Sequence, residues 1–310
     1  MTAFNKKPSG IIAALLAVIV VFLSATLYEH GIITEEFYSK LLVSVQNRIT
    51  GTSEEGVSVH FIDVGQAECI LIKAPEKNVL IDAGNIGCEK EIENHLRTNG
   101  VYKIDLLILT HPHSDHIGSA TAIVKKFPVS ETVIPEVPEE FLPTTSIFEE
   151  LLKTLSSKNV SVSYAKSGTA YELGDGAVLE ILGPEEYSGD NLNNYSVISK
   201  FVYGETSFLF TGDAEEEIEL ALVSSGKDLS CTVLNAGHHG SSTSNSAVFI
   251  RSANPEFAAI SCGLNNDYGH PHRETISSFN DFKIKYFRTD YDGNIIFRTD
   301  GKTVTVSTGR

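Results

Sequence analysis

The segment THPHSDHIGS places three histidines and one aspartate within six consecutive residues. They are His111, His113, Asp115 and His116. They follow the apolar stretch DLLILT, which predicts a buried strand, so they lie in a loop at a strand end. Side chains in such a loop can converge on one point without disturbing strand pairing. Imidazole nitrogen and carboxylate oxygen are ligands of Zn²⁺ and related divalent ions, and a turn cap would explain only one such residue, so the segment predicts a metal centre.

The spacing within this segment predicts two ions. His111 and His113 stand two positions apart in an extended stretch and can face one ion. Asp115 and His116 follow the turn and can face a second ion. We therefore expect two divalent metal ions, with Zn²⁺ as the first choice and Mn²⁺ as the alternative.

Two later strand ends carry further ligand candidates. Asp213 ends SFLFTGD, where a carboxylate can bridge two cations with its two oxygens, although capping the following helix is an alternative role. His238 and His239 follow CTVLNAG, and at least one of them should complete the metal site. We favour His238 as the ligand and His239 as a catalytic contact to the substrate, with the reverse assignment left open.

Two more residues complete the candidate site. Asp82 ends a predicted buried strand in LIDAG, where an ionised carboxylate needs partners. Supporting a ligand histidine would supply them, while a simple turn aspartate is the alternative. His270, in NDYGHPH, is a candidate substrate contact or proton donor, with a turn role beside the proline as the alternative.

These motifs resemble those of a known family. HPHSDH is similar to the H-x-H-x-D-H signature of the metallo-β-lactamase superfamily, and FIDVGQAECILI, VLIDAG, LFTGDAE and LNAGHHGSSTS follow in the superfamily's order. The combination most resembles the metallo-hydrolase domain of ComEC-type DNA-uptake proteins. The resemblance covers about residues 57–310 and implies an α+β fold, the four-layer αββα sandwich, with metal at one edge of the sheets.

The sequence departs from this family pattern in two places. GQAECILI carries Ala67, Glu68 and Cys69 where close relatives typically show Gly, Asp and Ser. In NNYSV, Asn193 and Asn194 stand where many members of the superfamily place a ligand histidine. One ion would then have fewer protein ligands and more water, and we place Asn194 beside the ligands as a supporting residue.

The expected chemistry is hydrolysis by a metal-activated water. Asp115 would orient the nucleophile, and His270 or the second of the paired histidines, His239, would protonate the leaving group. The resemblance favours a phosphoester or phosphodiester substrate, such as DNA or a cell-envelope polymer. A serine run that follows the paired histidines and leads toward a helix suits an oxyanion, although ordinary capping would explain it equally well.

The net charge of −16 argues against a nuclease, because such a surface repels nucleic acid at long range. Ester, lactone or thioester hydrolysis is therefore kept as an alternative function. A second alternative is a non-catalytic, membrane-tethered domain that binds metal. The sequence allows no protein partner to be inferred.

The N-terminal residues 1–30 predict a hydrophobic helix that anchors the chain in the cell membrane. Lys6 and Lys7 precede an uncharged stretch from Gly10 to Tyr28, which is about long enough to cross a bilayer. Lysines favour the cytoplasmic side, so the hydrolase would lie outside the cytoplasm. Secretion after cleavage of a signal peptide is the alternative. Residues 31–56 predict a connector, with a short stalk helix, and residues 57–310 the hydrolase domain.

Alternating patterns predict the elements that must position the site. Strands come first as a meander and then alternate with helices, which favours two packed sheets covered by helices. The expected strands are 57–64, 69–74, 78–82, 105–110, 196–204, 206–213, 231–236, 257–262, 295–300 and 302–307. The expected helices are 89–99, 117–127, 214–225 and 272–279.

Overall fold

The computed structural model describes residues 10–34, 37–38, 41, 57–184 and 187–310. It divides into two compact units, and the larger one comprises residues 56–95 and 103–310. The smaller unit contains helix α1 (Gly10–Glu29). Across the described residues, no helix combines the length and apolarity needed to cross a membrane, so the predicted span is not confirmed. Most of the predicted connector lies outside the described residues.

The first sheet has eight strands in the order β15-β14-β1-β2-β3-β4-β5-β6. From β15 through β14, β1 and β2 to β3, each strand pairs antiparallel with the next. From β3 through β4 and β5 to β6, each pairs parallel with the next. The strands are β1 (Val57–Phe61), β2 (Ile70–Lys73), β3 (Asn78–Ile81), β4 (Ile104–Ile108), β5 (Val129–Ile134), β6 (Ser161–Tyr164), β14 (Ile295–Thr299) and β15 (Val304–Thr308).

The second sheet has seven strands in the order β13-β12-β11-β10-β9-β8-β7. Strands β10 to β13 run parallel, and β7 to β10 pair antiparallel. The strands are β7 (Ala170–Glu172), β8 (Val178–Gly183), β9 (Ile198–Tyr203), β10 (Thr206–Phe210), β11 (Val233–Asn235), β12 (Phe257–Ile260) and β13 (Lys285–Arg288).

Both faces of the second sheet are buried, and β10 shows how. Phe208 and Phe210 point into the core between the two sheets, while Leu209 points into a second core on the opposite face. Successive strand residues point to opposite faces, so a continuous apolar run fits a sheet covered on both sides. Phe297 of β14 links the sheets, with its ring 5.9 Å from that of Phe61 and 6.3 Å from that of Phe208.

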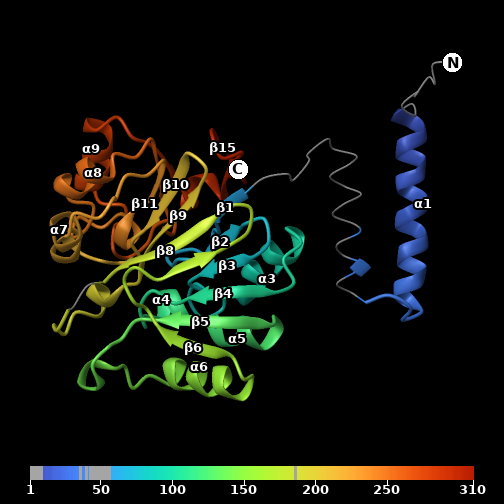
Figure 1. The fold of residues 1–310 in the computed structure, drawn as a ribbon, viewed down its shortest axis with the longest axis horizontal. Coiled ribbons are helices and arrows are strands. Elements are labelled where there is room, and N and C mark those ends of the chain that lie inside the picture. Colours follow the sequence, from blue (N-terminus) through green and yellow to red (C-terminus); the bar gives the residue numbers. More distant parts are fainter. Residues whose placement is uncertain (1–9, 35–36, 39–40, 42–56, 185–186) are drawn as a thin grey trace. The chain divides into compact units, whose positions relative to one another are not determined.

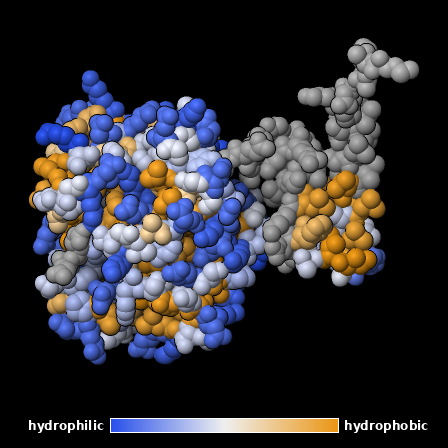
Figure 2. All heavy atoms as spheres, viewed as in Figure 1, coloured by the Kyte–Doolittle hydropathy of each residue, from blue (hydrophilic) through white to orange (hydrophobic). Residues whose placement is uncertain are grey.

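Helices cover the outer faces of this core. Figure 1 shows α7, α8 and α9 gathered beside the second sheet and α4, α5 and α6 beside the first. The predicted αββα sandwich is therefore confirmed, and the visible face of the larger unit in Figure 2 is mostly hydrophilic with scattered apolar residues. The helices are α3 (Glu89–Thr98), α4 (Ser114–Ile117), α5 (Ala120–Lys126), α6 (Ser146–Ser157), α7 (Glu216–Ser224), α8 (Ala247–Ala253), α9 (Arg273–Asp281) and α10 (Thr289–Asp292).

Glu219 of α7 braces the loop that follows β11. It is 1% exposed, and its carboxylate accepts hydrogen bonds from the backbone N–H groups of Asn245 (2.6 Å) and Ser246 (2.8 Å). The Asn245 side chain accepts a hydrogen bond from Gly237 N (3.0 Å) and donates one to Gly237 O (2.9 Å). Glu219 thus fixes, through Asn245, the residue that precedes the paired histidines.

The stability of the fold should depend on the protonation of Glu219. Burial raises the pKa of Glu219 from 4.5 to about 7. A carboxyl group with a higher pKa in the folded chain contributes stability that is complete below the unfolded pKa and is lost as pH rises through the folded one. Between those pH values, we expect the free energy of unfolding to fall by up to about 3 kcal/mol relative to a Glu219→Gln variant. Urea unfolding of both proteins across this range tests the prediction, and parallel pH profiles would contradict it.

Candidate metal centre

The candidate residues gather where parallel strands of both sheets end. Asp82 follows β3, the HPHSDH segment follows β4, Asp213 follows β10, and the paired histidines follow β11. The carboxyl ends of neighbouring parallel strands meet at one edge of a sheet, and ligands bind in the crevice outside them. Two packed sheets with strand ends at the same edge therefore bring residues more than a hundred positions apart into one site.

His116 directs its Nε2 atom into this site. Its Nδ1–H donates to Asp82 Oδ2 over 2.7 Å, because a carboxylate can only accept. Asp82 is itself fixed by Thr110, whose N–H and hydroxyl donate to its two oxygens at 2.8 and 2.7 Å. The other ring nitrogen, Nε2, faces Asp213, and a histidine held in this way would bind a metal through Nε2 after giving up any proton there.

His111 and His239 are oriented in the same way, each by a hydrogen bond from its Nδ1–H group. Thr110 gives its hydroxyl proton to Asp82, so its oxygen accepts from His111 Nδ1–H at 3.1 Å. His239 Nδ1–H donates to the carbonyl of Ser261 at 2.9 Å. Both histidines therefore also direct Nε2 toward Asp213, and each is held in orientation by the partner of its other nitrogen.

Asp213 lies at the centre of these three nitrogens. Its Oδ1 is 3.3 Å from His116 Nε2, and its Oδ2 is 3.8 Å from His111 Nε2 and 3.7 Å from His239 Nε2. Asp115 adds a second carboxylate, with Oδ2 3.4 Å from His239 Nε2. Four of these residues offer ligand atoms that all lie within 4.8 Å of one another: Asp115, His116, Asp213 and His239.

The chemistry of this group fits a divalent cation. His116 Nε2, His239 Nε2 and Asp213 Oδ1 are buried without a hydrogen-bond partner among the described residues, a costly arrangement that a metal would satisfy. Burial alone would lower the pKa of His116, but the carboxylates of Asp213 and Asp82 raise it well above its ordinary value. The attraction that holds a proton on His116 would equally favour a cation at the same nitrogen.

The first two histidines of the motif, His111 and His113, form a second group of candidate metal ligands. His113 Nδ1 lies 3.0 Å from His111 Nε2, so both face the same point. Asp213 lies beside both groups of donors and is placed to bridge them. The site therefore offers one four-residue group and one histidine pair, and the assignment of these residues as ligands remains a prediction.

The paired histidines differ in position. Both adopt left-handed backbone angles, with φ of 52° at His238 and 54° at His239, which non-glycine residues adopt infrequently. This turn buries His239 beside Asp115, whereas the side chain of His238 is 21% exposed and contacts Thr243 Oγ1 at 3.1 Å. The burial of His239 favours it as the ligand, the assignment that the sequence had left open, and His238 lies 3.6 Å from Asp213 at the cavity wall.

A polar cavity of about 310 Å³ opens above the group, and its walls include His113, Asn193 and His270. Gln66 accepts from Gly263 N with its oxygen (3.0 Å), so its amide nitrogen donates to His270 Nδ1 (3.3 Å). The His270 proton therefore resides on Nε2. Burial, with the neighbouring histidines, lowers the pKa of His270 to about 4, so at neutral pH it offers a hydrogen bond rather than an acidic proton.

The two asparagines of NNYSV have separate positions. Asn193 lines the cavity, so its amide can reach a substrate. Asn194 instead accepts from Glu215 N at 3.0 Å and donates to Glu217 Oε2 at 3.3 Å. Asn194 thus fixes the start of α7 just after Asp213 and does not line the cavity.

Sequence reasoning gave no role to Glu68, which the structure places under the metal group. Its side chain is fully buried and accepts from Asn235 Nδ2 of β11 at 2.8 Å, and burial raises its pKa to about 7. Its backbone N–H donates to Asp115 O at 3.1 Å, and its carbonyl accepts from Gly84 N at 2.8 Å. Glu68 therefore ties the second sheet to the motif loop. The sequence feature that could have indicated this role is a single acidic residue next to an apolar strand.

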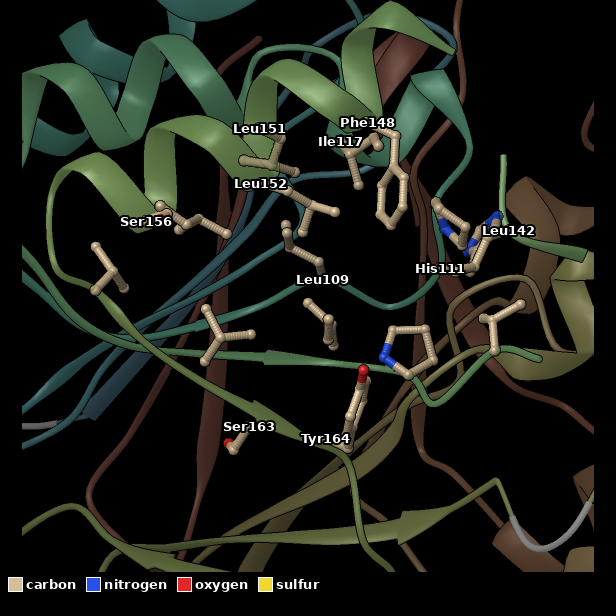
Figure 3. A pocket seen from close by; sticks show the side chains of 17 residues that line it. Leu109, His111, Ile117, Leu142, Phe148, Leu151, Leu152, Ser156, Ser163 and Tyr164 are labelled. Carbon is tan, nitrogen blue, oxygen red and sulfur yellow. The ribbon is translucent and has the colours of Figure 1, made fainter. Parts of the chain in front are cut away.

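A larger cavity of about 500 Å³ lies beside the motif loop and is mostly apolar (Figure 3). Leu151 and Leu152 of α6 face Leu109 and Tyr164 across it, and His111 stands at one end. The other predicted ligands do not line it. We place the chemistry in the smaller polar cavity, because that cavity carries the unpaired nitrogens and carboxylates.

With this geometry established, sequence comparison identifies the class of protein. The model of the metallo-beta-lactamase superfamily matches residues 62–263, and the chain belongs to this superfamily of metal-dependent hydrolases. Among curated relatives, ComE operon protein 3 of Bacillus subtilis is 32% identical over 82% of this chain and 34% of its own length. Competence protein ComA of Neisseria gonorrhoeae is 30% identical over 82% of this chain and 34% of its own length.

These relatives are competence proteins of the ComEC type, so the predicted resemblance is confirmed. The chain spans about a third of their length. Among solved structures, CmlA, a diiron beta-hydroxylase from Streptomyces venezuelae, superposes with a TM-score of 0.50 at 14% identity, over 83% of this chain and 57% of that one. This likeness concerns the fold alone.

Proposed function

We propose that this protein hydrolyses phosphodiester bonds with the help of two divalent ions. The observation that carries the proposal is the convergence of three histidine Nε2 atoms on Asp213 beneath a polar cavity of about 310 Å³. A site that combines ligands for Lewis-acidic metal ions with hydrogen-bond donors suits an anionic phosphoryl group. The names of the relatives, which refer to competence and recombination, support DNA as one candidate substrate.

In this proposal the ligands divide between the two ions. One ion would be held by Asp115, His116, His239 and Asp213, and the other by His111, His113 and Asp213. Divalent ions supply Lewis acidity and lower the pKa of water when bound, with Zn²⁺ the first choice and Mn²⁺ the alternative.

The remaining cavity residues would position the substrate. The side chain of Asp115 is 26% exposed and can accept a hydrogen bond from the attacking water. Asn193 and His270 Nε2–H can donate to the non-bridging oxygens of a phosphodiester. Because His270 is neutral at pH 7, we assign it this donor role in place of the proton transfer first considered.

The polarity of the cavity favours a phosphodiester over an ester with a long acyl chain. Among the described residues that line this cavity, Tyr268 is the one large side chain with apolar character, and the apolar cavity of Figure 3 is lined by different residues. An acyl chain would find little apolar surface within the polar cavity itself. Ester, lactone or thioester hydrolysis therefore remains the second candidate.

Metal removal and restoration test the proposed function. The full-length protein would be stripped with a chelator and then reloaded with Zn²⁺ or Mn²⁺. We expect chelation to lower cleavage of labelled single-stranded DNA or of bis(p-nitrophenyl) phosphate at least about a hundredfold, and reloading to restore it. Cleavage of p-nitrophenyl acetate alone would favour the alternative of ester, lactone or thioester hydrolysis. No hydrolysis by protein shown to bind metal would favour the non-catalytic alternative.

The location of this activity is also a proposal. Membrane attachment, with the hydrolase outside the cytoplasm, rests on the two lysines and the uncharged stretch of the N-terminal sequence. A cell-envelope polymer would be the accessible phosphodiester in that location, in addition to incoming DNA.

A further inference from the structure

Tyr268 is an exposed aromatic side chain at the wall of the catalytic cavity. Its side chain is 67% exposed, although it lines the same cavity as Asp213 and His239. Leu264, in the same loop, is 60% exposed. A single exposed aromatic residue is common on protein surfaces, so its position and its support decide whether it has a role.

The Tyr268 ring is held in place rather than left free. It stacks on His270 with a centroid distance of 5.5 Å and an interplanar angle of 21°, and His270 stacks on His239 at 6.2 Å and 28°. His270 thus links Tyr268 to the candidate ligand His239. No second aromatic ring packs against Tyr268 among the described residues, and the side chain is largely open to solvent.

The backbone under this ring is braced as well. Ser242 N donates to His272 Nδ1 at 2.9 Å, so the His272 proton lies on Nε2 and is donated to Tyr268 O at 3.1 Å. Asn266 closes the same loop by accepting from His270 N at 3.0 Å and donating to His270 O at 2.6 Å. A pre-ordered aromatic ring binds a planar partner at little cost in conformational entropy.

The charge of the cavity determines which kind of nucleic-acid contact it can make. None of the described residues that line it is a lysine or an arginine. Apart from the ions, the cavity can therefore gain little affinity from neutralising phosphates, which is the usual source of binding to nucleic acids. Stacking of a base on an aromatic ring needs no positive charge.

We infer that Tyr268 is a stacking platform for a nucleobase that adjoins the scissile phosphodiester. This inference rests on the proposed phosphodiesterase function and narrows its substrate to a nucleic acid with unpaired bases. It also explains how a protein with a net charge of −16 could select such a substrate.

Kinetics on matched substrates test the inference. For Tyr268→Ala, we expect the KM for a single-stranded oligodeoxynucleotide to rise about tenfold and the KM for the same strand with abasic sites to stay unchanged. Tyr268→Phe should behave like the wild type, because the ring is retained. Tyr291→Ala is the control, since Tyr291 is 62% exposed and does not line the cavity. An equal effect on both strands, or a Phe variant as impaired as the Ala variant, would overturn the inference.

A binding measurement separates this inference from the proposed function. The chain contains no tryptophan, so Tyr268→Trp would introduce a single fluorescent reporter. We expect dAMP to quench its emission in the metal-loaded protein and deoxyribose 5-phosphate to leave it unchanged, with no response from Tyr291→Trp. Quenching without any phosphodiester hydrolysis would refute the function and keep the stacking site. Hydrolysis without quenching or discrimination against abasic sites would refute the stacking site alone.

Discussion

Replacing Asp213 with alanine is expected to reduce hydrolysis at least about a thousandfold, because the several kcal/mol of transition-state stabilisation supplied by the ions would be lost. Asp213 is 2% exposed and lies within 3.8 Å of the Nε2 atoms of His111, His116 and His239. Its removal would leave those nitrogens without their shared carboxylate. The measurement is kcat/KM on the phosphodiester, together with the metal content of the purified protein.

Controls separate loss of metal from loss of the fold. Asp213→Asn keeps the shape and one oxygen, so we expect reduced metal content with a folded domain. Glu172→Ala removes an exposed carboxylate at the end of β7 and should change neither quantity. An Asp213→Ala protein with its full metal content and near wild-type kcat/KM would show that the candidate centre is misassigned.

Replacing Asp82 with alanine should have the second-largest effect, on both stability and metal affinity. Asp82 is fully buried and accepts three hydrogen bonds, two from Thr110 and one from His116. Removing one partner of such a buried network typically costs about 3–5 kcal/mol. Without its acceptor, His116 would lose its fixed tautomer, which typically lowers metal affinity about 10- to 100-fold.

Asp82→Asn separates the two effects. Asp82 has a φ of 57°, a left-handed conformation that asparagine tolerates and alanine does not. The asparagine variant should therefore recover part of the stability in urea unfolding. Asparagine is uncharged and has one acceptor oxygen in place of two, so it cannot replace the charge-assisted hydrogen bond from His116. Metal titration should still show weakened binding, and an Asp82→Asn protein with wild-type affinity would contradict the role of Asp82.

The sequence was sufficient to predict the motif residues, because their types and spacing carry the chemistry themselves. It could not decide between His238 and His239, since both follow the same strand and the choice depends on two successive left-handed residues that no local pattern indicates. Glu68 was missed for a related reason. Its partner, Asn235, is far away in the sequence and becomes a neighbour only when the two sheets pack.

The fold, like the site, could be predicted from the sequence only in part. Most of the strands that were predicted have long apolar runs, because they are buried on one or both faces, although the largely exposed strand β15 was predicted as well. Within the described residues, five strands were not predicted: β5, β6, β7, β8 and β13. In β6 and β7, which end their sheets, most residues are exposed and the apolar pattern is weak. Helix α6 was missed in the same region, although its buried face carries Leu151 and Leu155.

The strand order has a consequence for when the metal can be acquired during synthesis. Strand β1 pairs with β14, and β14 pairs with β15, so the first sheet is complete only after residues 304–308 have left the ribosome. The last candidate ligand, His239, is likewise translated long after the HPHSDH segment. Because a site built from distant segments rarely exists before the chain folds, a nascent chain would hold the motif without retaining an ion. Metal occupancy would then mark molecules whose two sheets have closed, and it would distinguish finished domains from stalled ones.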